Sequence, residues 1–200
     1  MENNKIYDYF VISALQPEVI GLDIDNLGIS GVGKVNATIK ALEIIHNHQP
    51  KLIINYGTVG AVHKDLDGIV DCTKFCQMDM DATPLDFKIG QTPFENEKKV
   101  PRIIDTNKIS DGYKLFNPIG KNLLCGTSDK FVVDKPSMRV DVVDMEAYAI
   151  AKVCHICDVK FISFKYISDR ANSDSPREWV DHCSDGVKKF KEILEHYDNI

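Results

Sequence analysis

Residues 34–56 read KVNATIKALEIIHNHQPKLIINY, and this stretch decides the fold class. Its first part, Lys34–His48, has the spacing of an amphipathic helix, with one apolar face formed by Val35, Ile39, Leu42 and Ile45. Pro50 ends that helix, and the apolar run Leu52–Tyr56 predicts a buried strand directly after it. A helix followed at once by a short apolar strand is typical of α/β proteins.

The rest of the chain repeats this alternation of apolar runs and helical patterns. Further strands are predicted over Tyr9–Leu15, Asn26–Ser30, Ile69–Phe75, Asn122–Cys125, Arg139–Val143 and Lys160–Ile167. A helix is expected after Pro17 and another over Met145–Cys157. The last helix begins with Ser175 as N-cap, Pro176 and a capping-box Glu178, and its apolar stripe is Trp179, Cys183, Val187, Phe190 and Leu194.

One segment departs from this pattern. Residues 76–121 carry four prolines, mixed charge and little periodicity, so we expect a long irregular excursion there. The chain shows no internal repeat. We therefore predict one domain over residues 1–200, with the excursion at about 76–121.

The composition excludes several classes of protein. Apolar residues make up 44% of the chain, which predicts a globular fold, and 30 acidic against 24 basic residues give a formal charge of −6. This balance argues against nucleic acid or an anionic membrane as the main partner. No apolar run reaches the roughly 18–20 residues that span a bilayer, and the polar N-terminus is unlike a secretion signal. We expect a soluble cytoplasmic protein.

Cysteine and histidine usage predicts no metal site and no other cofactor. The chain has six cysteines, too few for a disulfide scaffold, and we expect them to be reduced. Cys154 and Cys157 form the pair CHIC, but zinc would need a second pair at matching spacing, so buried thiols are the favoured interpretation. The six histidines form no paired ligand motif.

A glycine-rich segment precedes the first long helix. Gly28–Lys34 fits GxxxxGK, the start of a phosphate-binding P-loop, but the magnesium-binding Ser or Thr is replaced by Val35. A dinucleotide fingerprint also fails, because Asn36 stands where its third glycine should be. An NTPase is therefore disfavoured, although glycines before a helix can still bring backbone N–H groups close to a polar ligand.

Several segments look like parts of one site. They are SALQPEV (13–19), SGVGKVNA (30–37), INYGTVGAV (54–62), MDMDATPLDFKIGQTP (78–93), TSDKF (127–131), VVDMEAYAIAKV (142–153) and YISDRAN (166–172). In this order they resemble the purine nucleoside phosphorylase and uridine phosphorylase superfamily, and within it the 5'-methylthioadenosine/S-adenosylhomocysteine nucleosidases. The resemblance covers nearly the whole chain. It implies a three-layer sandwich with a mixed central β-sheet flanked by helices, and a purine nucleoside as the small-molecule partner.

The resemblance also assigns catalytic roles. Breaking an N-glycosidic bond requires a proton for the departing base, stabilisation of a cationic sugar and a nucleophile on the opposite face. Asp169 follows a strand, where ligands of open α/β sheets bind, and by resemblance it protonates the adenine. Glu18 corresponds to the carboxylate that activates water. Glu146 and Met145 match the residues that hold the ribose, and the negative charge there would favour an oxocarbenium-like transition state.

Other residues are implied to contact or orient the substrate. Phe131 matches the ring that stacks on the base, and Val132 the residue whose backbone reads its edge. Ser168 would help to orient Asp169. Further positions matched to the substrate site are Thr58, Asp144 and Lys165, each of which differs from the usual family residue. Lys165 stands where the nucleosidases usually have an arginine near the attacking water.

The 5'-tail of the nucleoside is expected in an apolar pocket. By resemblance this pocket includes Leu15, Val32 and Met145, with Leu85 and Pro93 supplied by a neighbouring subunit. A homodimer is therefore expected. Between residues 19 and 30 the chain is shorter than is usual in the family, which could open one side of the pocket.

The sequence favours hydrolysis over phosphorolysis. Phosphorylases of the superfamily carry an arginine before the GT or GS motif, because a guanidinium fork holds phosphate, and here Asn55 takes that place. Glu18 would repel phosphate and activate water. The alternatives are a phosphate-dependent phosphorylase, a nucleosidase for another purine nucleoside such as futalosine or inosine, and a nucleoside-binding protein without activity.

Overall fold

The computed structural model describes residues 8–108 and 115–198. Eight strands form one mixed sheet: β1 (Tyr9–Ser13), β2 (Leu27–Ile29), β3 (Leu52–Ala61), β4 (Ile69–Gln77), β5 (Ile103–Asp105), β6 (Leu123–Thr127), β7 (Val142–Asp144) and β8 (Lys160–Asp169). The helices are α1 (Lys34–His48), α2 (Ala147–Ile156), α3 (Ser175–His182) and α4 (Val187–Tyr197), with short 3₁₀ turns η1 (Gln16–Val19), η2 (Thr83–Leu85) and η3 (Thr106–Lys108).

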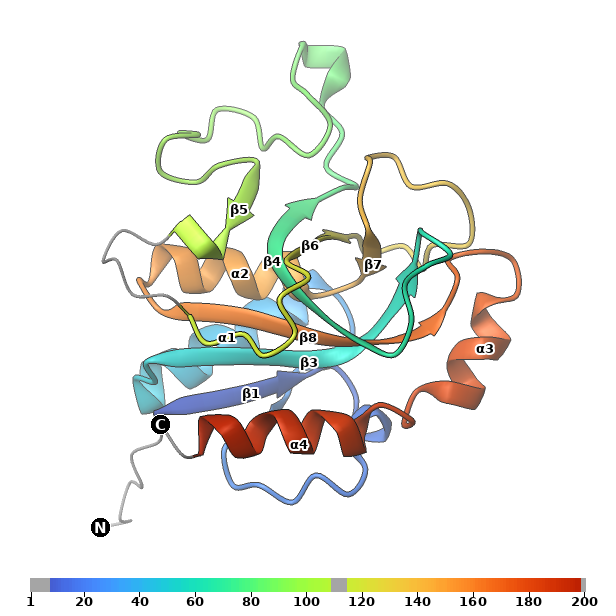
Figure 1. Cartoon of the computed structure of the whole chain (residues 1–200). Helices are drawn as coiled ribbons and strands as arrows, with labels where there is room; N and C mark the ends of the chain where they lie inside the picture. The colour runs from blue at the N-terminus through green and yellow to red at the C-terminus, as the bar shows by residue number, and fades with distance from the viewer. Residues whose placement is uncertain (1–7, 109–114, 199–200) are drawn as a thin grey trace.

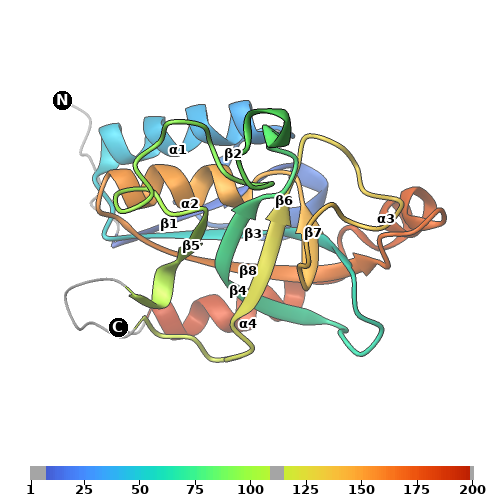
Figure 2. The same ribbon diagram turned by 90° about the horizontal axis from the view of Figure 1, so that it is seen from above.

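The elements are arranged in three layers. Figure 2 shows α1 and α2 on one side of the sheet and α4 on the other. Ala37, Ala41 and Ile44 of α1 pack with α2 against one face of the sheet. Phe190 and Leu194 of α4 pack against the opposite face. The predicted fold class, an α/β sandwich with a mixed sheet between helices, is confirmed.

The sheet closes on itself around its longest strands (Figure 1). β3 pairs in parallel with β1 and β8 and antiparallel with β7. β8 pairs antiparallel with β4, which continues in parallel through β6 to β7. Strands β3, β8, β4, β6 and β7 therefore form a ring. Because β1, β3 and β8 are parallel, their carboxyl ends meet at one edge, where ligands of such sheets bind.

The first helix presents a different face to the sheet than its pattern predicts. The face predicted from the sequence points largely outward, since Val35, Ile39 and Leu42 have exposed fractions of 70%, 60% and 47%. The buried residues of α1 are Ala37, Ala41 and Ile44. Two alanines let the helix approach α2 closely, and this contact decides which face is buried.

Several predicted bounds are also corrected. The third strand runs on from Tyr56 to Ala61, and the second long helix begins at Ala147. The predicted last helix is two helices, α3 and α4. Ser175 is the first residue of α3 rather than its N-cap, and its hydroxyl accepts a hydrogen bond from Asn172 N at 2.9 Å.

The excursion leaves the sheet after β4 and returns at β5, which pairs antiparallel with β4 (Figure 1). Two contacts hold the excursion against α2. Lys152 Nζ on α2 lies 2.7 Å from Glu95 Oε1, and the ring of His155 is hydrogen-bonded to the Lys99 carbonyl. Part of the predicted range, residues 109–114, lies outside the described residues. Since one sheet joins strands from residue 9 to residue 169, we propose that residues 1–200 form one domain.

The six cysteines are free thiols. Cys154 is buried, as the sequence predicts, but Cys157 is exposed, so the buried-thiol interpretation holds for only one member of the CHIC pair. No cluster of His, Cys, Asp or Glu among residues 8–108 and 115–198 could hold a metal ion. In the same residues no helix is long and apolar enough to cross a membrane.

Candidate active site

A cavity of about 480 Å³ lies at the carboxyl edge of β1, β3 and β8. It brings together seven parts of the chain: the β1–η1 segment, β3, the loops before α1 and after β6, the β7–α2 junction, the end of β8 and α3. Ten of the fourteen site residues predicted from the sequence line it: Leu15, Glu18, Val32, Thr58, Phe131, Val132, Asp144, Met145, Glu146 and Asp169.

Glu18 is buried, and hydrogen-bond donors surround its carboxylate. Oε2 accepts from Ser13 Oγ and from Leu15 N, both at 3.1 Å. Oε1 accepts from Thr58 N at 2.9 Å and from Thr58 Oγ1 at 2.8 Å. A Cβ on Gly57 would lie 3.2 Å from Oε1, so the glycine lets the strand run beneath the carboxylate. These contacts fix Glu18 in one orientation.

Asp169 ends β8 and is also buried. Its Oδ2 accepts a hydrogen bond from Ser168 Oγ at 2.9 Å, and its Oδ1 accepts one from Ala171 N at 2.9 Å. The β3–β8 register shifts between Val59 and Gly60, and a Cβ on Gly60 would lie 2.8 Å from Asp169 Oδ1. A bulge beside a glycine thus makes room for the acid, as bulges near functional sites often do.

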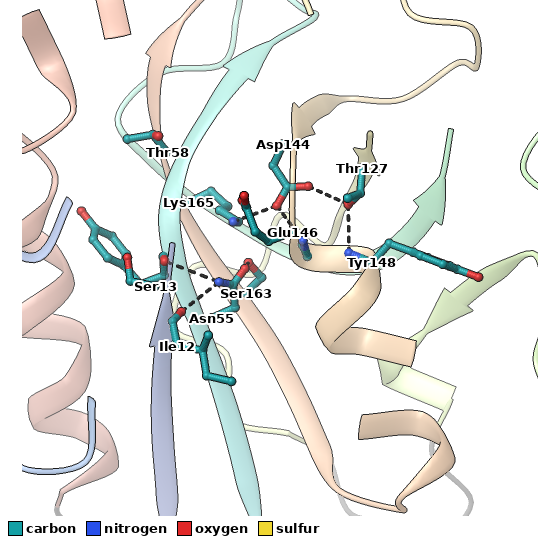
Figure 3. A network of polar contacts seen from close by, with 12 residues as sticks. Ile12, Ser13, Asn55, Thr58, Thr127, Asp144, Glu146, Tyr148, Ser163 and Lys165 are labelled. Carbon is teal, nitrogen blue, oxygen red and sulfur yellow. Dashed lines mark hydrogen bonds and ion pairs between the residues drawn. The ribbon is translucent and has the colours of Figure 1, made fainter. Parts of the chain in front are cut away.

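A buried ion pair joins Asp144, which lines the cavity, to Lys165, which does not (Figure 3). Lys165 Nζ is 2.9 Å from Asp144 Oδ2, and the two side chains are at most 2% exposed. Asp144 also accepts from Thr127 Oγ1 at 2.6 Å and from Ala147 N at 2.9 Å. Burial acts to lower the pKa of Lys165, but the charges of Asp144, Cys125 and Glu146 and the hydrogen bond with Asp144 together outweigh it, so the pKa is raised. Lys165 is therefore a buried cation that does not line the cavity.

Glu146 joins this network from the β7–α2 junction. Its Oε1 accepts a hydrogen bond from Gly33 N at 2.8 Å. Burial, together with the charge of Asp144, raises its pKa to about 7. The side chain lines the cavity beside Met145. The β7–α2 junction thus supplies both carboxylates of the pair Asp144 and Glu146.

The glycine-rich segment has no free phosphate cradle. Gly33 N donates to Glu146, and Lys34 N donates to Asp129 Oδ1 at 2.8 Å. The Lys34 ammonium is 2.6 Å from Asp79 Oδ1. Carboxylates therefore take the positions that a nucleotide phosphate would take at a helix N-terminus. This arrangement argues further against an NTPase.

Four predicted site residues do not line the cavity. Ser168 contacts Asp169 from the strand, as the resemblance implies, and Lys165 is buried against Asp144. Leu85 and Pro93 belong to the excursion, and Leu85 is 65% exposed. The resemblance assigns these last two to a neighbouring subunit.

Among the lining residues that sequence reasoning missed are Pro176 and Trp179 of α3. Trp179 Nε1 donates a hydrogen bond to Thr58 Oγ1 at 2.8 Å. Trp179, Cys183 and Val187 are spaced as one apolar stripe of a helix. The sequence therefore predicted Trp179 as a core residue. The break between α3 and α4 separates it from that stripe, and the turn-forming pair Asp185 and Gly186 is the local signal that could have marked this break.

Comparisons with known proteins agree with this geometry. A family model described as "Phosphorylase superfamily" matches residues 26–111 and 126–197, which defines the class of protein. A curated relative from Staphylococcus haemolyticus, named 5'-methylthioadenosine/S-adenosylhomocysteine nucleosidase, is 31% identical over 176 residues, covering 83% of this chain and 77% of its own length. The chain therefore belongs to the 5'-methylthioadenosine/S-adenosylhomocysteine nucleosidase family of the phosphorylase superfamily.

Solved structures show the same fold. An S-adenosylhomocysteine nucleosidase from Streptococcus pyogenes superposes with a TM-score of 0.75 at 22% identity, covering 93% of both chains. The futalosine hydrolase of Helicobacter pylori superposes with a TM-score of 0.78 at 16% identity, covering 96% of this chain and 97% of its own. Enzymes named for different nucleosides thus share this architecture.

Proposed function

We propose that this protein is a nucleosidase that hydrolyses the N-glycosidic bond of 5'-methylthioadenosine, S-adenosylhomocysteine or a related adenine nucleoside. The products would be free adenine and a 5-substituted ribose. The observation that carries the proposal is that two buried carboxylates reach one cavity from different elements, Glu18 from the turn η1 and Asp169 from the end of β8. The curated nucleosidase relative supports the same activity.

Each carboxylate has a defined task in this reaction. As the bond between C1' and the adenine breaks, the electron pair of that bond leaves with the adenine. Asp169 supplies a proton to the departing adenine. Glu18 takes a proton from the water whose oxygen bonds to C1'. Glu146, which lines the same cavity, would accept hydrogen bonds from the ribose hydroxyls. Its charge, when present, would favour the cationic sugar.

The polar groups of the site favour water over phosphate as the acceptor. No arginine of the described residues lines the cavity, and its one lining lysine, Lys130, is exposed on the loop after β6. Asn55 is buried within the sheet, where its amide donates to the Ile12 carbonyl and accepts from Ser163 Oγ. Phosphate binding normally relies on arginine forks or free backbone N–H groups.

The activity is tested by following base release from 5'-methylthioadenosine by chromatography, in phosphate-free buffer and with added phosphate. We expect adenine release that is independent of phosphate. Release only with phosphate would make the protein a phosphorylase. Inosine and futalosine in parallel reactions would reveal a preference for another nucleoside, and a chain that binds nucleoside without turnover would be a binding protein.

The role of Asp169 has its own test. Asp169→Asn removes the proton donor while preserving size, and we expect kcat to fall by about 10²–10⁴-fold. Asp181→Asn, on the exposed side of α3, is the matched control and should leave kcat unchanged. Full activity of Asp169→Asn would refute its assignment as the acid.

We also propose a homodimer. The exposed apolar face of α1, defined by Val35, Ile39 and Leu42, is the kind of surface that marks an interface. Leu85 is exposed as well, consistent with the tail-pocket role that the resemblance gives it in a neighbouring subunit. Figure 2 shows α1 as the outermost element on its side of the sheet.

Sedimentation velocity tests the dimer. Ile39→Asp places a charge in the centre of the apolar face, so the variant should sediment as a monomer and lose activity. Asn47→Asp, near the end of the same helix, should remain dimeric. A wild-type monomer with full activity would refute the proposal. The cytoplasmic location stays a prediction from the sequence, and a role in methionine salvage is what the family resemblance implies.

A further inference from the structure

We propose that Trp179 is a positioning residue that directs the Thr58 hydroxyl proton onto Glu18. It thereby holds in place the carboxylate that activates water. The inference rests on the proposed function, because it concerns the same carboxylate. Trp179 lies 121 positions away from Thr58 in the chain and reaches it only through the placement of α3 over the end of β3 and β8.

Three hydrogen bonds define the relay. Trp179 Nε1 is 2.8 Å from Thr58 Oγ1, and Thr58 Oγ1 is 2.8 Å from Glu18 Oε1. Thr58 N lies 2.9 Å from the same oxygen. Threonine therefore contacts the carboxylate with both its backbone and its side chain.

The chemistry of the groups fixes the direction of the relay. An indole N–H can only donate, so the Thr58 oxygen must accept from Trp179. A hydroxyl has a single proton, and with one lone pair occupied by the indole that proton is directed to Glu18. Without the indole, the hydroxyl could rotate and donate elsewhere. Trp179 thus selects one of the rotational states of Thr58.

Contacts at both ends of α3 hold the indole in place. At its start, Arg170 N donates to Glu178 Oε2 at 3.3 Å, and Ser175 Oγ accepts from Asn172 N. Beyond its end, Gly186 packs so closely on Tyr166 that a Cβ there would lie 2.5 Å from the tyrosine side chain. The indole ring forms part of the cavity wall, while its N–H serves the relay.

A double-mutant cycle separates the N–H from the ring. Trp179→Phe keeps an aromatic ring and removes the donor, so kcat should fall by about three- to tenfold, the range of one neutral hydrogen bond, with KM changed less than about twofold. Thr58→Val should lower kcat at least as much. In the Thr58→Val background, Trp179→Phe should have no further effect, because the relay is already broken.

Two controls accompany the cycle. Thr58→Ser keeps the hydroxyl and should retain most of the activity. Val180→Ala, an exposed neighbour on α3, should leave kcat unchanged. The inference would be overturned if Trp179→Phe had the same kcat as the wild type. It would also be overturned if the loss of kcat in the double variant equalled the product of the losses in Trp179→Phe and Thr58→Val.

A second readout does not depend on turnover. The chain has one tryptophan, so its indole N–H gives a single signal in a ¹⁵N-labelled sample. The signal should move, and its exchange with solvent should accelerate, in Thr58→Val. An unchanged signal would overturn the relay even in an active enzyme. A wild type that releases no base, with the indole signal still sensitive to Thr58, would instead overturn the proposed function.

Discussion

Replacing Glu146 by glutamine should make the folded protein more stable at alkaline pH while removing the charge that faces the ribose. The side chain is 8% exposed and lies near Asp144. Glutamine has nearly the same shape and can still accept the hydrogen bond from Gly33 N. The substitution therefore changes the charge of the site and little of its packing.

The magnitude follows from the pKa of the carboxyl group. Burial and the charge of Asp144 raise the pKa of Glu146 from 4.5 to about 7. The folded protein then binds this proton more tightly than the unfolded chain. The resulting stability is fully present below about pH 4.5 and is lost as pH rises through about 7. A shift of this size corresponds to about 3 kcal/mol.

Urea unfolding followed by circular dichroism, from about pH 4 to about pH 8, measures this effect. The difference in the free energy of unfolding, variant minus wild type, should rise by about 3 kcal/mol over that range. Glu192→Gln is the control, and its exposed carboxylate should produce little change. A difference that stays flat with pH, or that falls, would refute the reasoning.

Three further substitutions test the packing of the site. Lys165→Met leaves Asp144 buried without its ion-pair partner and should reduce the free energy of unfolding by about 3–5 kcal/mol, measured by urea unfolding. Tyr56→Phe removes the one buried side-chain polar atom of the described residues that has no hydrogen-bond partner, so thermal unfolding should show unchanged or higher stability. Gly60→Ala places a Cβ 2.8 Å from Asp169 Oδ1 and should lower kcat by at least about tenfold in steady-state assays.

These substitutions have clear contrary outcomes. Lys189→Met breaks an exposed ion pair on α4 and should cost less than about 1 kcal/mol, so an equal loss for Lys165→Met would mean that burial adds nothing. A marked destabilisation by Tyr56→Phe would reveal a partner for the hydroxyl. Wild-type kcat in Gly60→Ala would show that Asp169 tolerates displacement.

Much of the site follows from the sequence because its residues lie at strand ends. Asp169 directly follows an apolar run, and parallel strands bring their carboxyl ends to one edge, so its place near a ligand cavity could be predicted. Asn55, standing where the phosphorylases have an arginine, already argued for hydrolysis. The resemblance added Glu18 and Glu146, whose local surroundings alone do not distinguish them from exposed or capping carboxylates.

The sequence by itself determined the alternation of helix and strand, the fold class and the order of the segments that form the cavity. Periodicity shows which residues share a face of a helix, but not what packs against that face. Only the tertiary structure decided that the Ile39 face of α1 points outward, that Lys165 is buried against Asp144 instead of lining the cavity, and that Trp179 leaves the predicted core stripe to contact Thr58. Each depends on contacts between segments distant in the chain, and such contacts leave no local signal.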